Sequence, residues 1–523
     1  MPKLELGPTA QGATVVPAAP ITEGARRRPR LFLNILANYA GRGVSAVATL
    51  VMVPLYLRTL GVEAYGIVSL LAIAQSFVGL LDFGLGITLN REMARSGPGE
   101  RPDLLRTFEI VYWGAAAVLF GLSFFAAPLV TRLVNVKATS PEEVRDAIVL
   151  IGITVALQFP CSAYGAALAG IERQVALNAI TGLCVAVRAV ASVLVLSFVS
   201  RTPAALIACY LLAALGQAIA SGWASWHYAA PFELARPKFH GEVFAGVWRF
   251  SMQAFALTIA GICMSQSDKA SVAGLTAMSD FGAYSLSAQF AAIFTVICGP
   301  IGLAAFPRLA GHARTGATDK LGQTYGQVLR FAAFVTFPPA LLACAFPGEL
   351  ILFWTHNPTV ARGAVSILPL LVAATALNGF FGIGINLSLA AGYVRLPMIL
   401  NFAMAIVAVL LAPWAVKRMG ATGAALSCLA VNLTWGCIFV PLLHRRLLPE
   451  SWTKYYRGSL VPLLVAAIPV VIARLASPAL TRAGVNVILL IVTAYAGSIG
   501  AIACAHGGLR RSYAILRHAA ASS

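Results

Sequence analysis

Apolar stretches long enough to cross a bilayer recur along almost the whole chain, and short polar or charged segments separate them. A helix of about 20 apolar residues crosses a hydrocarbon core of about 30 Å and pairs all its own backbone polar groups. We therefore predict fourteen membrane-spanning helices, with residues 31–56, 64–89, 108–131, 147–170, 176–199, 203–228, 248–272, 281–306, 328–354, 363–391, 396–416, 421–443, 459–476 and 484–506.

The composition supports a chain that lies mostly in the membrane. Hydrophobic residues make up 59% of the 523 residues and charged residues only 11%, whereas a soluble domain has about 25% charged residues. The fold class predicted from the pattern and the composition together is an all-α polytopic membrane protein.

The formal net charge is +19, but the basic residues lie between apolar stretches and do not gather on one soluble domain, so no nucleic-acid partner is expected. With the predicted spans, about 25 of the 38 lysines and arginines fall on the side that both termini share and about 10 on the other. We expect both termini, including a disordered tail over residues 1–30 and a second tail over 507–523, to be cytoplasmic, in the inner membrane of a bacterium.

Two pairs of loop motifs indicate an internal duplication. Tyr65-Gly66 before predicted span 2 matches Phe281-Gly282 before span 8, with Ser, Leu and Ala following at the same offset of 216 residues. The Gly-x-x-Arg loop that begins at Gly170 recurs at offset 222. Motifs repeated in this order favour a duplicated unit over chance recurrence of common loop types.

A six-helix unit repeated in tandem has two copies in the same orientation, related by an axis along the membrane normal. We call residues 31–228 the N-lobe and residues 248–443 the C-lobe. Two further helices, within 459–506, fall outside the duplication.

The same loops carry a resemblance to a known family, which extends over residues 31–443. The stretches that carry it are Pro54-Leu-Tyr-Leu-Arg58-Thr-Leu-Gly61-Val-Glu-Ala-Tyr65-Gly66, Leu81-Asp82-Phe-Gly84-Leu-Gly86, Asp268-Lys269, Phe281-Gly282-Ala-Tyr284-Ser285 and Pro307-Arg308-Leu-Ala. In this order they resemble the polysaccharide-transporter, or O-antigen flippase, family of the multidrug/oligosaccharidyl-lipid/polysaccharide exporter (MOP) superfamily.

The resemblance implies two six-helix lobes around a central cavity, as in multidrug (MATE) exporters, and transport by alternating access. It also implies a substrate, an undecaprenyl-diphosphate-linked oligosaccharide that moves from the cytoplasmic to the periplasmic leaflet for exopolysaccharide, capsule or O-antigen biosynthesis. The expected partners are this substrate, membrane lipids, and the polysaccharide polymerase and chain-length machinery.

Polar residues inside the N-lobe spans form two stripes at helical spacing. They are Asn34, Asn38, Arg42, Ser45 and Thr49 in span 1, and Asn178, Thr181, Arg188 and Ser192 in span 5. Ionisable residues inside a span face a cavity or a partner, and the planar fork of arginine suits a diphosphate. Asn38, Arg42 and Arg188 are therefore candidates for substrate binding. The alternative is that the arginines tie helices together or pair with Asp82.

Four residues of the C-lobe are further candidates for the substrate cavity: Gln253, Asp268, Lys269 and Asn378. The alternative is that Lys269, at the end of a span, extends to the interface and that Asp268 is paired locally. Asp82, in the N-lobe, is a candidate for ion coupling, and its alternative is a hydrogen bond to a broken backbone.

The sequence shows no catalytic constellation. It has no P-loop of the form GxxxxGK[ST], and its nine cysteines lie in apolar segments without metal-ligand spacing, so we expect a transporter without metal or cofactor. Alternatives are an ion-coupled multidrug antiporter, a lipid II flippase, and a membrane glycosyltransferase or polymerase. An enzyme of that last kind should show a carboxylate pair or a large extramembrane loop, and neither is evident.

Overall fold

A computed structural model describes residues 48, 51–97, 99–134, 136, 139–229, 259–448, 452–482 and 486–505, and most of these residues are helical. The helices are α2 (Val62–Leu81), α3 (Leu85–Arg95), α4 (Arg101–Leu133), α5 (Pro141–Gly170), α6 (Gln174–Phe198), α7 (Pro203–Ala229), α9 (Met278–Arg314), α10 (Thr318–Ala345), α11 (Pro347–Thr355), α12 (Pro358–Ala390), α13 (Arg395–Leu447), α14 (Trp452–Arg482) and α15 (Val487–Ala505). Residues 51–60 and 259–275 are also helical.

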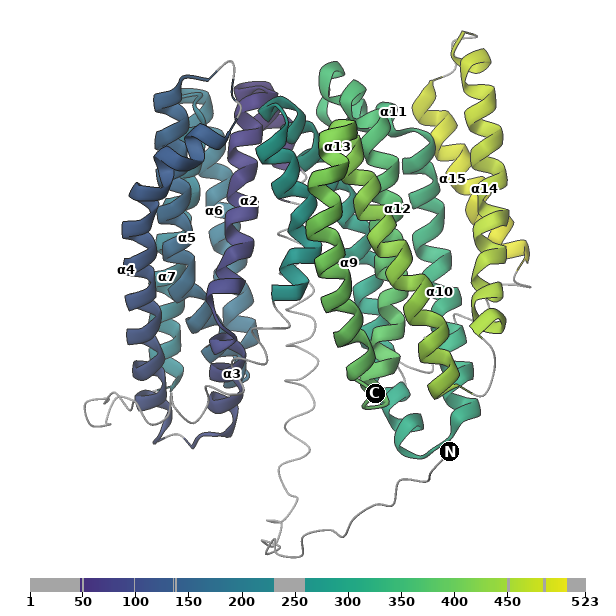
Figure 1. Cartoon of the computed structure of the whole chain (residues 1–523), viewed down its shortest axis with the longest axis horizontal. Coiled ribbons are helices and arrows are strands. Elements are labelled where there is room, and N and C mark those ends of the chain that lie inside the picture. Colours follow the sequence, from purple (N-terminus) through teal and green to yellow (C-terminus); the bar gives the residue numbers. More distant parts are fainter. Residues whose placement is uncertain are drawn as a thin grey trace, which may run out of the picture.

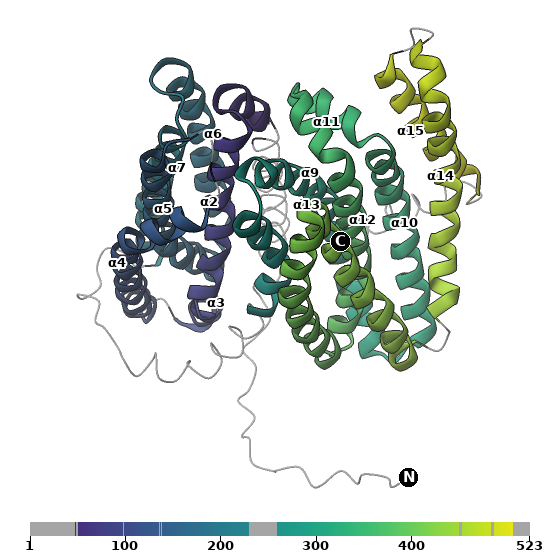
Figure 2. The same cartoon turned by 45° about the horizontal axis from the view of Figure 1, so that its top comes forward.

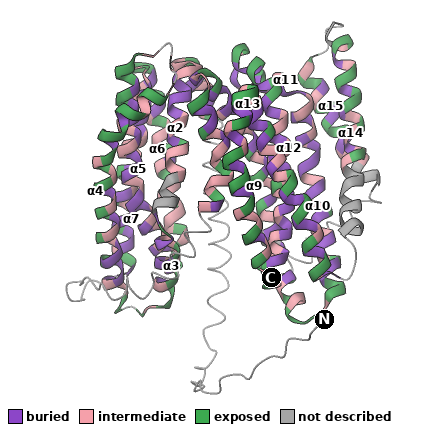
Figure 3. Ribbon diagram, viewed as in Figure 1, coloured by how far each residue is buried: buried purple, intermediate pink, exposed green. Residues whose placement is uncertain are grey.

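The described helices have the length and surface of membrane spans. Nine of them, with α13 counted once, are long and apolar enough to cross a bilayer. Large apolar side chains lie exposed on their outer faces, such as Phe125 (80% exposed), Phe198 (82%) and Leu475 (77%), and Figure 3 shows exposed residues along the outside of both groups of helices. Apolar surface of this extent suits lipid and not water, which confirms a polytopic α-helical membrane protein.

The helices form two groups, as the duplication predicts. Figures 1 and 2 show α2–α7 on one side and α9–α13 on the other, with α14 and α15 at the outer edge of the second group. Within the first group α5 packs against α2, α3, α4, α6 and α7, and within the second α12 packs against α9, α10, α11 and α13. Helix α5 is the fourth predicted span and α12 the tenth, so the central helix of each group occupies the same place in the repeat.

The two lobes meet where α2 packs against α9, and this contact has the reciprocity of a two-fold axis. A Cβ atom on Gly66 would lie 2.4 Å from the carbonyl oxygen of Met278, and one on Gly282 would lie 2.4 Å from that of Val62. Gly282 is Gly66 displaced by 216 residues, and Met278 is Val62 displaced by the same number. Each copy therefore touches the other through the same pair of positions, as an isologous interface requires.

The predicted span 64–89 is broken in two. Helix α2 ends at Leu81, and α3 begins at Leu85 after Phe83 (φ 48°) and Gly84 (φ 73°) adopt left-handed conformations. Glycine reaches this region without strain, so Gly84 allows the break. Apolar residues continue on both sides of Asp82, so periodicity alone does not place the break.

Helix α13 is continuous in secondary structure but contains a chain reversal, at Gly420 (φ 60°, ψ −146°). The indole Nε1 of Trp435 donates to Asn401 Oδ1 at 2.9 Å, although the two residues are 34 positions apart. An unbroken helix rises 1.5 Å per residue and would hold them about 50 Å apart. The two segments are therefore antiparallel, in agreement with the predicted spans 396–416 and 421–443.

The repeated Gly-x-x-Arg loops share a motif but not the residue that makes the turn. Glu172 (φ 61°) and Gly392 (φ 71°) take the left-handed position, whereas Gly170 serves close packing, because a Cβ there would lie 2.5 Å from the Asn90 carbonyl oxygen. The residues after the two turns make cation–π contacts with reversed roles. Arg173 lies 4.4 Å over the Tyr228 ring, and Arg446 lies 4.5 Å over the Tyr393 ring.

Candidate functional site

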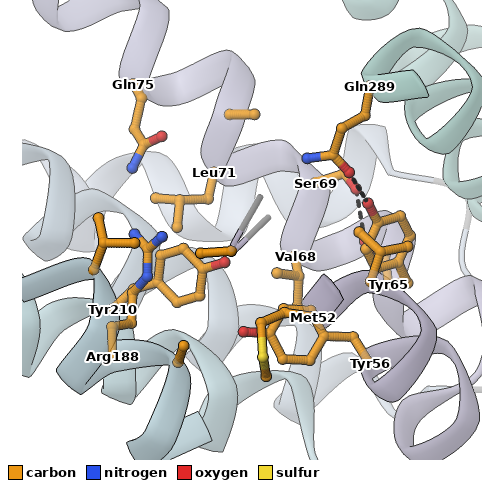
Figure 4. A pocket seen from close by; sticks show the side chains of 15 residues that line it. Met52, Tyr56, Tyr65, Val68, Ser69, Leu71, Gln75, Arg188, Tyr210 and Gln289 are labelled. Atoms are coloured by element: carbon orange, nitrogen blue, oxygen red, sulfur yellow. Dashed lines mark hydrogen bonds between the residues drawn. The ribbon is translucent and has the colours of Figure 1, made fainter. Parts of the chain in front are cut away.

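A cavity of about 180 Å³ lies in the N-lobe beside its contact with the C-lobe (Figure 4). The helix at 51–60 and α2, α6 and α7 form most of its wall, and α9 of the C-lobe closes one side. The side chains that give the cavity its polar character are Tyr56, Tyr65, Ser69, Gln75, Arg188, Tyr210 and Gln289. Hydroxyl, amide and guanidinium groups thus converge in a space otherwise lined by small and apolar residues.

Arg188 is the charged residue among the described residues that line this cavity. Its Cζ atom lies 4.2 Å from the centroid of the Tyr210 ring, a geometry that orients and stabilises a guanidinium through the face of the ring. Among the described residues no carboxylate forms an ion pair with Arg188, and none of the described lining residues is acidic. The guanidinium therefore keeps N–H donors available for an anion.

Helical spacing explains why Arg188 faces the cavity. Val185, Arg188 and Ala189 all line it, and positions three and four apart share one face of α6. Two other members of the predicted stripe donate hydrogen bonds to the backbone of α6: Ser192 Oγ donates to the Arg188 carbonyl at 2.7 Å, and Asn178 Nδ2 donates to the Gln174 carbonyl at 2.8 Å. Asn38, Arg42 and Gln253 lie outside the described residues.

The C-lobe candidates form a second polar group that does not line the N-lobe cavity. Asp268 is 6% exposed and accepts a hydrogen bond of 2.5 Å from the Tyr284 hydroxyl. Lys269 Nζ donates to the Ser265 carbonyl at 3.1 Å. Asn378 Nδ2 donates to Asn432 Oδ1 at 2.7 Å.

Cys428 and Asn432 bring these C-lobe residues together. The thiol of Cys428 lies in the electrostatic field of both Asp268 and Lys269, and Asn432 is its hydrogen-bond partner. Asn378, the third candidate, contacts the same Asn432. The residues chosen from α12 and from the helix at 259–275 therefore belong to one cluster, and α13 supplies the link that sequence reasoning missed.

Asp82, the coupling candidate, lies at the break between α2 and α3. It is 8% exposed, and its Oδ2 accepts the backbone N–H of Gly86 at 2.9 Å. Its Oδ1 accepts the hydroxyl of Tyr112 and, at 3.4 Å, that of Ser162. Asp82 therefore satisfies a free N–H at the start of α3 and joins the break to α4 and α5.

Replacing Asp82 by alanine should destabilise the protein by about 1–3 kcal/mol, because the Tyr112 hydroxyl and the first turn of α3 lose their acceptor. Asp82→Asn keeps an acceptor and should lose less. Thermal unfolding of the purified protein measures both changes. An alanine variant as stable as the wild type would contradict the capping role, whereas an asparagine variant of normal stability that fails to transport would reveal a coupling role.

A carboxylate network in the N-lobe escaped the sequence analysis. Glu109 of α4 accepts hydrogen bonds from the Tyr164 hydroxyl (2.5 Å) and from Trp226 Nε1 (3.1 Å), and it forms an ion pair with Arg106 at 2.8 Å. It thereby joins α4 to α5 and α7. An acidic residue inside a predicted span was the signal available for it.

The fold and the cavity define a class: a two-lobed helical membrane protein with a polar cavity whose described lining carries one arginine. A family model described as "Polysaccharide biosynthesis protein" matches residues 56–355, more than half of the chain, and the protein belongs to this family. A comparison with curated protein sequences finds no match.

Solved transporter structures share the fold. A lipid II flippase, MurJ, in an inward closed conformation is 11% identical, with a TM-score of 0.64 over 89% of this chain and 98% of that one. An inward-facing MATE multidrug-resistance transporter of the MOP superfamily is also 11% identical, with a TM-score of 0.62 over 81% and 96%. A MOP-superfamily transporter from Pyrococcus furiosus is 14% identical, with a TM-score of 0.52 over 80% and 95%.

At these identities the likeness establishes the fold. The family connects the protein with polysaccharide biosynthesis. The family and the fold thus agree with the resemblance that the loop motifs carry.

Proposed function

We propose that the protein translocates undecaprenyl-diphosphate-linked oligosaccharide units from the cytoplasmic to the periplasmic leaflet of the inner membrane, for the biosynthesis of a surface polysaccharide. The observation that carries this proposal is Arg188, a guanidinium without a carboxylate partner among the described residues, held over Tyr210 in a polar cavity. A diphosphate offers pairs of oxygens that match the arginine fork. The neighbouring hydroxyl and amide groups can exchange hydrogen bonds with sugar hydroxyls.

The size of the cavity indicates which part of the substrate it takes. Its volume is about 180 Å³, below the roughly 300–1,000 Å³ of sites that enclose a drug-sized ligand. A diphosphate fits such a space, and a whole oligosaccharide does not. The described cavity therefore suits the diphosphate, and the saccharide has to extend beyond it.

The absence of acidic residues among the described lining residues separates this proposal from its closest competitor. A multidrug exporter that binds cations needs a negative or neutral site, and the cavity here carries Arg188. Lipid II is also linked through a diphosphate, so this anchoring group does not distinguish a lipid II flippase from the proposal.

The proposed direction of transport is the one that the family resemblance implies, and the topology supplies the orientation of the protein. The excess of lysine and arginine on the side shared by the termini supports cytoplasmic termini. A polysaccharide polymerase and chain-length machinery are then the proposed periplasmic consumers of the product.

Reconstitution in liposomes tests the function. The purified protein should move a fluorescent undecaprenyl-diphosphate saccharide between leaflets, measured by the fraction that a membrane-impermeant quencher reaches over time. A fluorescent phosphatidylcholine is the matched lipid control and should stay at the rate of empty liposomes. Movement of a cationic dye without movement of the diphosphate lipid would overturn the proposal in favour of a multidrug exporter.

A further inference from the structure

Gln289 is the residue by which the C-lobe reaches the N-lobe cavity. We infer that it binds the substrate and that, while the cavity is empty, it latches the two lobes together through Tyr65. A ligand that takes the hydrogen-bonding position of Tyr65 on Gln289 then releases the latch. The identity of that ligand rests on the proposed function, but the latch itself does not.

The contact joins two helices that belong to different lobes. The Tyr65 hydroxyl, in the first turn of α2, donates to Gln289 Oε1 of α9 at 3.0 Å (Figure 4). Tyr65 is 5% exposed, so its hydroxyl has little access to water. Both residues line the cavity, and among its described lining residues Gln289 alone comes from the C-lobe. The hydrogen bond therefore lies at the boundary between the binding space and the lobe interface.

The latch lies next to the contact between the two lobes. Tyr65 directly precedes Gly66, whose backbone lies against Met278 at the start of α9. A change at the Tyr65 side chain thus acts one residue from a close backbone approach between the lobes. Separation of α2 from α9 at this point must break the hydrogen bond to Gln289.

The internal repeat shows that lobe packing does not itself require this hydrogen bond. The positions equivalent to Tyr65 and Gln289 at the offset of 216 residues are Phe281 and Ile73. Phe281 is fully buried and Ile73 half-buried, and neither side chain has a hydrogen-bonding group. The contact between the lobes therefore has a polar pair, Tyr65 and Gln289, beside the N-lobe cavity and an apolar pair at the positions related by the repeat. The polar pair occurs only where the cavity is.

The chemistry of Gln289 permits an exchange of partners. Its Oε1 accepts from Tyr65, and among the described residues its Nε2 has no hydrogen-bond partner. A sugar hydroxyl can donate to Oε1 and a phosphate oxygen can accept from Nε2. A ligand held by Arg188 in the same cavity can therefore bond to both Oε1 and Nε2 of Gln289, whereas Tyr65 bonds to Oε1 alone.

Hydrogen–deuterium exchange of the full-length purified protein tests the latch without any transport assay. Tyr65→Phe and Gln289→Leu each remove one partner and should speed exchange in the peptides that cover residues 61–69 and 278–289 by about three- to tenfold, the effect of one net hydrogen bond. The double variant should exchange no faster than either single variant, because both remove the same interaction.

Tyr56→Phe is the matched control. It removes another tyrosine hydroxyl that lines the cavity, but one that does not bond to Gln289 of the C-lobe. It should leave exchange at these two peptides unchanged. If Tyr65→Phe and Gln289→Leu exchange like the wild type or like Tyr56→Phe, or if their effects add in the double variant, the latch is overturned.

The ligand arm uses undecaprenyl diphosphate as the probe. It should speed exchange of the same peptides in the wild type and have no further effect in Gln289→Leu. A probe that binds without changing the wild-type exchange overturns the exchange of partners. A probe that does not bind overturns the proposed substrate, and with it the ligand half of the inference, while the comparison of ligand-free variants still decides the latch.

Discussion

Substitution of Arg188 by alanine is expected to reduce transport of the diphosphate-linked substrate by about 10- to 100-fold, the loss that follows when charge-assisted hydrogen bonds are removed. No other basic side chain lines the described part of the cavity. Arg188→Lys keeps the charge but loses the planar fork, and we expect it to retain intermediate activity.

Complementation of a flippase-deficient strain measures this loss, and quantification of the protein in membranes accompanies it. Arg362→Ala is the matched control, because Arg362 is an exposed arginine at the start of α12, away from the cavity, and its loss should leave transport normal. Normal transport by an abundant Arg188→Ala protein would show that the cavity does not hold the diphosphate. A parallel fall in abundance and transport would instead assign Arg188 a structural role through its contact with Tyr210.

The sequence predicts the helical architecture well because the signal for a membrane span is local. Each predicted span has helical structure in its described part, including the two segments of α13, which the sequence separates at Gly420. The break after Leu81 was anticipated only in the alternative for Asp82, a hydrogen bond to a broken backbone, because its position depends on the backbone conformation of Phe83 and Gly84 and not on hydrophobicity.

The candidate site was predicted only where charge marks it. Arg188 stood out because an ionisable residue in an apolar helix is costly unless it faces a cavity or a partner. Tyr56 and Tyr210 carry no such mark, since an aromatic residue in a span faces lipid, a neighbouring helix or a cavity with no difference in the pattern. Which of these applies depends on how α6, α7 and the helix at 51–60 pack.

Contacts between the lobes could not be predicted from the sequence either, because they depend on how the helices pack. Tyr65 and Gln289 are 224 residues apart, and only the relative position of the two lobes brings them together. The repeated motif did identify Gly66 and Gly282 as equivalent residues. It did not show that each glycine packs against the partner lobe.

Gly66→Ala and Gly282→Ala are expected to reduce transport to a similar extent, by about tenfold or more. In each variant the new Cβ would lie 2.4 Å from a carbonyl oxygen of the opposite lobe, and a backbone atom cannot move aside without separating α2 from α9. The lobes then cannot close at this contact, and the transport cycle loses one of its end states.

The matched control for these two variants is Gly182→Ala in α6, because a Cβ there would have no atom within 4 Å. Alanine is the better helix former by about 1 kcal/mol, so this variant should transport normally and unfold at an equal or higher temperature. Liposome transport and thermal unfolding of all three variants provide the comparison. Because the two glycines are related by the two-fold axis, both variants should be affected. If one of the variants at Gly66 and Gly282 transports normally while the other fails, transport does not depend on the reciprocal contact between α2 and α9.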